Sequence, residues 1–192
     1  MNYLAHFHLS GNKEHLLLGN FIADAVKGTV LDAYQDDIQK GIRMHRSIDF
    51  YTDRHPFTCR SKDRLRAEFK HYSGVIVDVF YDHFLAKNWA EFSNESLPDY
   101  SNRIYSLLEL HSGIFPDKCK HILPYMRRYD WLVSYAEVDG IGKVLSAMSK
   151  RVREGSKMEL AQAALERDYE LFEKDFRDFY SELIVHTEIF RE

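Results

Sequence analysis

The chain has 192 residues with a formal net charge of −4, and it contains 13 Phe and 12 Tyr. This aromatic content excludes a disordered protein, and the slight acidity gives no general attraction to nucleic acid or to an anionic membrane. No apolar run approaches the ~20 residues of a membrane span, and the first residues lack the pattern of a signal peptide. Two cysteines, Cys59 and Cys119, do not make a disulfide framework, so we expect a cytoplasmic protein without nucleic-acid or membrane partners.

Helical periodicity dominates the chain, and no alternating strand pattern extends beyond a few residues. The predicted helices, bounded by Gly and Pro, cover residues 13–27, 33–52, 57–71, 75–92, 99–111, 125–137, 139–153 and 157–190. The last helix has an apolar stripe in steps of four and three residues, which is typical of core packing. This stripe consists of Leu165, Tyr169, Phe172, Phe176, Phe179 and Leu183. The sequence predicts one all-α domain over residues 1–192, a helical bundle with a long C-terminal helix.

Three of the predicted helices carry ionisable residues on faces that are otherwise apolar. Positions three and four apart share a helix face, and on this basis the residues concerned are Asp24, His45, Asp49, Asp78, Asp82 and His83. Buried carboxylates without partners are costly, and crowded carboxylates repel one another. One divalent cation bound by carboxylate oxygens and imidazole nitrogens would satisfy several of them together. Mn²⁺, Fe²⁺, Zn²⁺ and Mg²⁺ all suit such mixed ligands.

A purely structural interpretation stays open beside this one. His45 and Asp49 could form a simple helix pair, and Asp82 and His83 could hydrogen-bond locally. A buried ion-pair network that fixes helix register would produce the same pattern. Spacing alone does not distinguish such a network from a metal site.

Four ordered motifs resemble the acyl carrier protein phosphodiesterase family, also called acyl carrier protein hydrolase. They are MNYLAHFHL at 1–9, LLGNFIADAVKG at 17–28, GIRMHRSIDFYTD at 41–53 and VDVFYDHF at 77–84. WLVSY at 131–135 also fits the later part of the family. The resemblance implies an HD-domain-like, all-helical phosphohydrolase dependent on Mn²⁺. Such an enzyme would remove 4′-phosphopantetheine from holo acyl carrier protein and leave the apo protein.

The resemblance also implies the residues of the site. The implied metal ligands are His6, Asp24, His45, Asp78 and Asp82, with Asn20, Asp49 and Asp53 in support. The catalytic candidates are His83 and Asp82, which the motifs imply, and Arg46, which stands beside His45. We expect His83 to protonate the leaving serine oxygen or to position the phosphate, because its unperturbed pKa is near neutrality. Arg46 would bind a phosphoryl oxygen or would be a surface charge. An ordinary HD enzyme has an adjacent His-Asp pair, whereas the adjacent pair here is the reversed Asp82-His83.

Residues 40–70 carry nine Lys or Arg and four Asp or Glu, a net charge of +5. These charges could be solvated helix faces, or they could dock an acidic carrier protein. The docking candidates are Arg43, Arg54, Arg60, Lys62, Arg64 and Arg66. Three rival functions remain: a metal phosphohydrolase acting on a nucleotide or another small phosphate ester, a non-catalytic helical protein, and a carrier-protein binding module without turnover.

Overall fold

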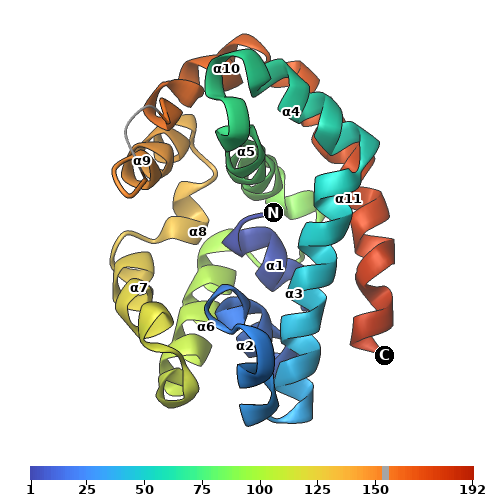
Figure 1. Ribbon diagram of the computed structural model, residues 1–192, viewed down its shortest axis with the longest axis vertical. Helices are drawn as coiled ribbons and strands as arrows, with labels where there is room; N and C mark the ends of the chain where they lie inside the picture. Colours follow the sequence, from blue (N-terminus) through green and yellow to red (C-terminus); the bar gives the residue numbers. More distant parts are fainter. Residues whose placement is uncertain (153–155) are drawn as a thin grey trace.

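The computed structural model describes residues 1–152 and 156–192, which form helices and connecting turns without a β-strand (Figure 1). The helices are α1 Tyr3–Leu9, α2 Glu14–Ile22, α3 Asp36–Arg54, α4 Pro56–Phe69, α5 Ser73–Lys87, α6 Leu97–Leu110, α7 Asp117–Arg128, α8 Trp131–Ser134, α9 Val138–Ser149, α10 Ala161–Arg167 and α11 Tyr169–Arg191. The predicted all-α fold is confirmed. The predicted helix end at 153 lies outside the described residues. No described helix combines the length and the apolar character that crossing a membrane requires.

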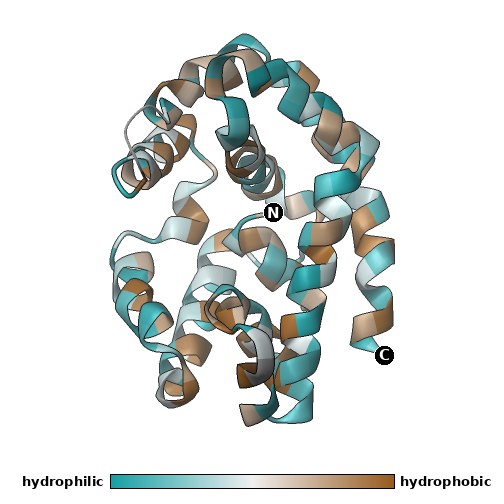
Figure 2. Ribbon diagram, viewed as in Figure 1, coloured by the Kyte–Doolittle hydropathy of each residue, from teal (hydrophilic) through white to brown (hydrophobic). Residues whose placement is uncertain are grey.

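One cluster of buried apolar side chains extends from Met1 to Leu183 and connects the described helices. α5 lies at its centre, and Val77, Phe80 and Phe84 are completely buried because this helix is apolar on nearly every face. Helices α3 and α11 instead alternate hydrophilic and hydrophobic residues along their length (Figure 2), as expected for helices with one face in solvent. Asp78, Asp82 and His83 therefore project from a helix that is buried over most of its length.

The C-terminal region differs from the single long helix that was predicted. α10 ends at Arg167 and α11 begins at Tyr169, because the backbone of Asp168 leaves the helical region with φ −116° and ψ 27°. Short acidic residues such as Asp168 favour these junctions, since their side chains compete for local hydrogen bonds. The predicted apolar stripe is nevertheless buried on both sides of the break, with Leu165 in α10 and Phe172 in α11 both inaccessible to solvent.

The region near Pro124 also differs from the prediction. Pro124 lies inside α7, which ends at Arg128, and α8 begins only at Trp131. The predicted helix over 125–137 is therefore wrong. Proline removes one hydrogen bond of a helix, but Pro124 is exposed, so water can satisfy the carbonyl that this leaves free.

Two glycines bring α2 and α3 into backbone contact. A methyl group on Gly19 would lie 2.1 Å from the carbonyl oxygen of Ile38, and one on Gly41 would lie 2.4 Å from that of Leu16. Only glycine permits so close a crossing. Because Asn20 follows Gly19 and His45 lies one turn after Gly41, this crossing places their side chains opposite each other.

Candidate functional site

A cavity of about 970 Å³ lies between α1, α3 and α5 on one side and α7, α8 and α9 on the other. The first side is rich in carboxylates and imidazoles, namely His6, Asp24, His45, Asp49, Asp53 and Asp78. The N-terminus of the chain lies between the two sides (Figure 1). Side chains from distant segments therefore converge on one cavity, as the sequence predicts for Asp24, His45 and Asp78.

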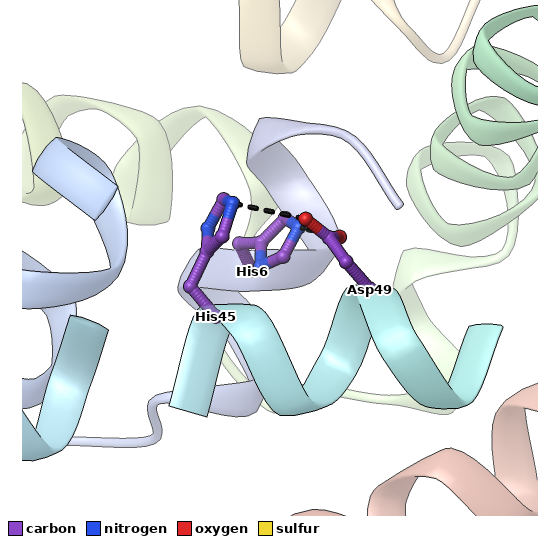
Figure 3. A group of neighbouring side chains, drawn as sticks. All are labelled: His6, His45 and Asp49. Carbon is purple, nitrogen blue, oxygen red and sulfur yellow. Dashed lines mark ion pairs between the residues drawn. The ribbon is translucent and has the colours of Figure 1, made fainter. Parts of the chain in front are cut away.

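His6, His45 and Asp49 lie next to one another at this cavity (Figure 3). His6 Nε2 lies 3.2 Å from Asp49 Oδ1, and His45 Nε2 lies 3.1 Å from Asp49 Oδ2. The two imidazole rings stack with their centroids 4.0 Å apart. One ligand atom from each residue lies within 4.8 Å of the other two, which is close enough for a single cation to contact all three. We call these three residues the His-His-Asp cluster.

Asp24 extends the cluster toward solvent. It lies on the short 3₁₀ helix Ala23–Ala25, directly after α2, and its Oδ1 is 3.3 Å from His45 Nε2. Its side chain is 72 % exposed, whereas His45 is buried. The interaction with His45 lowers the pKa of Asp24. Asp24 is therefore an ionised carboxylate at the rim of the cluster.

A hydrogen-bond network orients the imidazole of His45. Asn20 Nδ2 donates to the carbonyl oxygen of His6 at 2.9 Å and to Ser10 Oγ at 3.1 Å, so its Oδ1 is the acceptor for His45 Nδ1 at 3.0 Å. This network assigns a proton to Nδ1 of His45, and it directs Nε2 toward Asp24 and Asp49. Such an outer hydrogen bond is typical of histidines that bind metals.

The unpaired polar atoms test whether a cation fits here. His45 Nε2 is buried within ion-pair distance of Asp24 and Asp49 but has hydrogen-bond geometry to no atom of the described chain. His6 Nδ1 is likewise buried without a partner in the described residues. Buried polar nitrogens of this kind are uncommon. The residues fit a divalent cation with mixed nitrogen and oxygen ligands, because a shared cation would satisfy Nε2 and both carboxylates together.

The charges of the cluster are strongly coupled. Burial, together with nearby positive charge, lowers the pKa of His6 to about 4. Burial also acts to lower the pKa of His45, but the carboxylates of Asp24 and Asp49 outweigh it and raise this pKa to about 9. Burial acts to raise the pKa of Asp49, but the two imidazoles hold it well below its usual range. Without a cation, a proton on His45 therefore supplies the positive charge between the two carboxylates.

Asp78 lines the same cavity and forms an ion pair with the terminal amine. The ammonium group of Met1 lies 2.8 Å from Asp78 Oδ1 and 3.8 Å from Asp49 Oδ1. Burial raises the pKa of Asp78, although the ammonium group opposes this change. Asp78 thus faces the cluster across a positive charge and does not contact an imidazole in the described interactions.

Asp82 and His83 face other parts of the protein and do not line the cavity. Asp82 accepts hydrogen bonds from the backbone N–H groups of Asn2, Leu4 and Ala5 at 3.2, 2.7 and 3.3 Å, which fixes the start of α1. Burial raises its pKa to about 7. The ligand and catalytic roles predicted for Asp82 stay predictions, and these contacts favour a structural role.

His83 is also completely buried, and both of its ring nitrogens have partners. Nδ1 lies 2.8 Å from the carbonyl oxygen of Tyr135, and Nε2 lies 2.8 Å from the hydroxyl of Tyr169. These bonds connect α5 to α11 and to the residue that follows α8. The catalytic role predicted for His83 stays a prediction, and its contacts favour a structural role too.

Arg46 is exposed on α3 and donates a hydrogen bond to the carbonyl oxygen of Val26 at 2.9 Å. It therefore holds the segment that follows Asp24, and its predicted contact with a phosphoryl oxygen stays a prediction. Asp53 lines the outer part of the cavity and pairs with Lys62 at 3.4 Å.

The opposite side of the cavity was not predicted from the sequence. Tyr125 of α7, Tyr129 and Trp131 line it together with one face of α9. Tyr125 and Tyr129 are 57 % and 60 % exposed, which is unusual for large aromatic residues. The available signal was the spacing of Val144, Ala147 and Met148, but similar spacing occurs on any helix that packs against a core. We call this side the aromatic wall.

The family model for acyl carrier protein phosphodiesterase matches residues 1–183. Acyl carrier protein phosphodiesterase of Photorhabdus laumondii subsp. laumondii is 32 % identical over 189 residues, which cover 98 % of this chain and 96 % of the relative. The proteins of the same name from Serratia proteamaculans and Yersinia pestis are each 34 % identical, over 96 % and 94 % of both chains. No solved structure matches this chain. The chain therefore belongs to the acyl carrier protein phosphodiesterase family, which consists of phosphoric diester hydrolases.

Proposed function

We propose that this protein hydrolyses the phosphodiester bond between a serine of holo acyl carrier protein and 4′-phosphopantetheine. The products would be apo acyl carrier protein and free 4′-phosphopantetheine. The His-His-Asp cluster carries this proposal, because its donor atoms lie within 4.8 Å of one another inside a cavity of about 970 Å³. The names of the relatives support the carrier protein as the substrate. The free cysteines Cys59 and Cys119 are compatible with the reducing cytoplasm in which such a substrate would be found.

The proposed cofactor is Mn²⁺, with Mg²⁺, Fe²⁺ and Zn²⁺ as alternatives for the same ligands. A divalent cation would lower the pKa of a water molecule and offset the negative charge of the phosphodiester. His6, His45 and Asp49 would hold it, with Asp24 beside them at the rim. The predicted ligands Asp78 and Asp82 do not contact this group: Asp78 is separated from it by the terminal amine, and Asp82 is enclosed by α1.

The chain's own residues would prepare the site in three ways. Asn20 keeps the His45 proton on Nδ1, so the lone pair of Nε2 is available to a ligand. Asp49 contacts both imidazoles and keeps them stacked. Asp24 is exposed and ionised, and it is placed to accept a proton from an attacking water molecule.

The test is to incubate the protein with holo acyl carrier protein and Mn²⁺ and to determine the mass of the carrier protein. We expect loss of the 4′-phosphopantetheine mass with gain of a free serine. Asp49→Asn should abolish the reaction, while Asp37→Asn, an exposed carboxylate on the same helix, should leave it unchanged.

Three other outcomes would contradict the proposal. Hydrolysis of nucleotides with no turnover of holo carrier protein would indicate a small-molecule phosphohydrolase. Tight binding of the carrier protein without a change in its mass would indicate a binding module. Neither binding nor turnover would indicate a non-catalytic helical protein.

A further inference from the structure

The aromatic wall is the part of the cavity that the cluster does not use. Residues at 140, 143, 144, 147, 148 and 151 line the cavity, so α9, together with Arg151 two residues beyond it, turns one face toward it. Val144, Ala147 and Met148 make most of this face apolar. Lys143 contributes an ammonium group that has no ion pair among the described residues.

The position of this wall is fixed by the fold. A methyl group on Gly140 would lie 1.9 Å from the carbonyl oxygen of Ser134, so the start of α9 is pressed against α8. Trp131 of α8 also stacks at a tilt against Tyr3 of α1, with ring centroids 6.2 Å apart. Because α1 carries His6, this contact sets the aromatic wall and the His-His-Asp cluster at a fixed separation across the cavity.

The cavity is much larger than a phosphate and a cation require. Pockets of about 300–1,000 Å³ typically hold ligands of several hundred daltons, mainly through apolar contacts with a few polar groups. With a cation bound, the cluster on one side would attract an anion. Tyrosine, tryptophan and aliphatic side chains lie on the other side, together with the charged residues Glu137, Asp139, Lys143 and Arg151. The ligand that fits is an elongated, mostly uncharged chain joined at one end to a phosphate.

We propose that the aromatic wall binds the pantetheine arm of the substrate, so that the arm enters the cavity while the folded carrier protein stays at its mouth. This inference rests on the proposed function. The aliphatic part of the arm would pack on Tyr129, Trp131 and Met148, and Lys143 would donate to an amide oxygen of the arm. The phosphate at the end of the arm would lie at the cluster.

A binding experiment separates the wall from the cluster. The probes are free 4′-phosphopantetheine and inorganic phosphate, added to the Mn²⁺-loaded full chain and measured by calorimetry. Ala147→Trp would fill the cavity next to the wall, and Ala163→Trp is the matched control on the exposed side of α10. We expect Ala147→Trp to weaken the binding of 4′-phosphopantetheine at least tenfold and to leave the binding of phosphate unchanged. Ala163→Trp should change neither affinity.

A second variant guards against misfolding of the first. Tyr129 is 60 % exposed, so Tyr129→Ala should fold normally, which circular dichroism can check. Tyr129→Ala should also weaken the binding of 4′-phosphopantetheine more than the binding of phosphate. Unchanged affinity for 4′-phosphopantetheine in both variants would overturn the inference, as would an equal loss of both probes.

The turnover of holo carrier protein distinguishes the two levels of the proposal. If the wild-type protein removes the arm but Ala147→Trp and Tyr129→Ala have wild-type KM values, the aromatic wall is wrongly assigned and the proposed function stands. If the wild-type protein does not remove the arm, the proposed function fails and the inference fails with it. We expect wild-type turnover and a KM raised at least tenfold in Ala147→Trp.

Discussion

At the residue scale, the site depends on one amide that touches no substrate. Asn20 is buried, and its three hydrogen bonds to His6, Ser10 and His45 leave it one orientation. The direction of His45 Nε2 follows from this orientation, because Asn20 accepts from the opposite ring nitrogen. The cluster is therefore positioned by a side chain outside it.

Removing this amide should weaken the metal site without altering its ligands. We expect Asn20→Ala to reduce the affinity for Mn²⁺ by about 10–100-fold, as is common when an outer hydrogen bond to a ligating histidine is lost. Electron paramagnetic resonance of free Mn²⁺ measures this directly. Asn20→Asp retains an acceptor for His45 and should lose less of the affinity for Mn²⁺. Asn102→Ala, at an exposed position, should leave this affinity unchanged. Wild-type affinity in Asn20→Ala would show that His45 needs no positioning.

The buried carboxylate of Asp175 has a structural role away from the cavity. Asp175 of α11 is buried and accepts hydrogen bonds from Arg60, Arg64 and Ser61 of α4. Burial acts to raise the pKa of Asp175, but these donors outweigh it and lower the pKa. Arg60 and Arg64 were candidates for docking a carrier protein, and their ion pairs with the buried Asp175 favour a structural role instead.

Asp175→Asn should destabilise the fold by roughly 3 kcal/mol, because two arginines lose their buried partner. Urea unfolding at pH 7 measures this loss. Since the pKa of Asp175 is lowered in the folded state, its stabilisation is present above the unfolded value of about 4 and is lost as the pH falls through the folded value. The wild-type and variant stabilities should therefore converge in acid. Asp63→Asn removes an exposed ion pair with Arg66 on α4 and should be neutral. A difference that persists in acid would contradict this account.

At the element scale, the crossing of α2 and α3 builds the site. Gly19 and Gly41 bring the backbones together, and Asn20 and His45 meet as a result. The proposed ligands come from α1, which carries His6, and from α3, which carries His45 and Asp49.

Gly41→Ala should separate these helices. We expect a loss of about 1–3 kcal/mol in unfolding free energy from overpacking, together with weaker Mn²⁺ binding. Gly113→Ala is the control, because a methyl group there meets no atom within 4 Å. Chemical denaturation and a Mn²⁺ titration on the same samples measure both effects. If Gly41→Ala loses stability but binds Mn²⁺ normally, the crossing does not position the site.

The exposed face of α3 is the best remaining candidate for docking the carrier protein. Arg43, Arg46, Phe50 and Arg54 follow one another at helical spacing on this face, and His45 and Asp49 project from the same helix into the cavity. Arg54 also lies over the ring of Phe50, with its guanidinium carbon 3.7 Å from the ring centroid. Attraction of an acidic partner here would act close to the site.

The double variant Arg43→Glu/Arg54→Glu should raise KM for holo carrier protein about tenfold and change kcat little, because these charges contribute to association. The wild-type kcat/KM should fall with increasing salt, and the variant should respond less. Lys118→Glu, an equivalent exposed change on α7, is the control. A wild-type kcat/KM that is flat from low to high ionic strength would exclude electrostatic docking.

At the scale of the whole molecule, the sequence pattern predicted the helical class and the convergence of Asp24, His45 and Asp78 on one cavity, and the family resemblance added His6. Helical periodicity and repeated polar positions are local signals, so they can be recognised in the sequence alone. Asp82 and His83 show the limit of prediction from spacing. Their spacing resembles that of the ligands, but only tertiary contacts reveal that backbone N–H groups and a tyrosine hydroxyl satisfy them.

The aromatic wall could not be predicted from the sequence, because it also depends on tertiary contacts. Tyr125, Tyr129 and Val144 look like ordinary helix residues until α7, α8 and α9 are placed opposite α1 and α3. The end of α10 at Arg167 and the helical Pro124 were also missed, because a local break or continuation depends on exposure and neighbouring contacts.

Under the proposed function, hydrolysis requires a divalent cation held by His6, His45 and Asp49. The direct measurement is the rate at which the metal-stripped protein converts holo to apo acyl carrier protein, followed by mass spectrometry as Mn²⁺ is added. We predict no conversion before addition, recovery with Mn²⁺ in the wild type, and none at any Mn²⁺ concentration in Asp49→Asn. Full conversion by the stripped protein, or wild-type recovery in Asp49→Asn, would contradict the account.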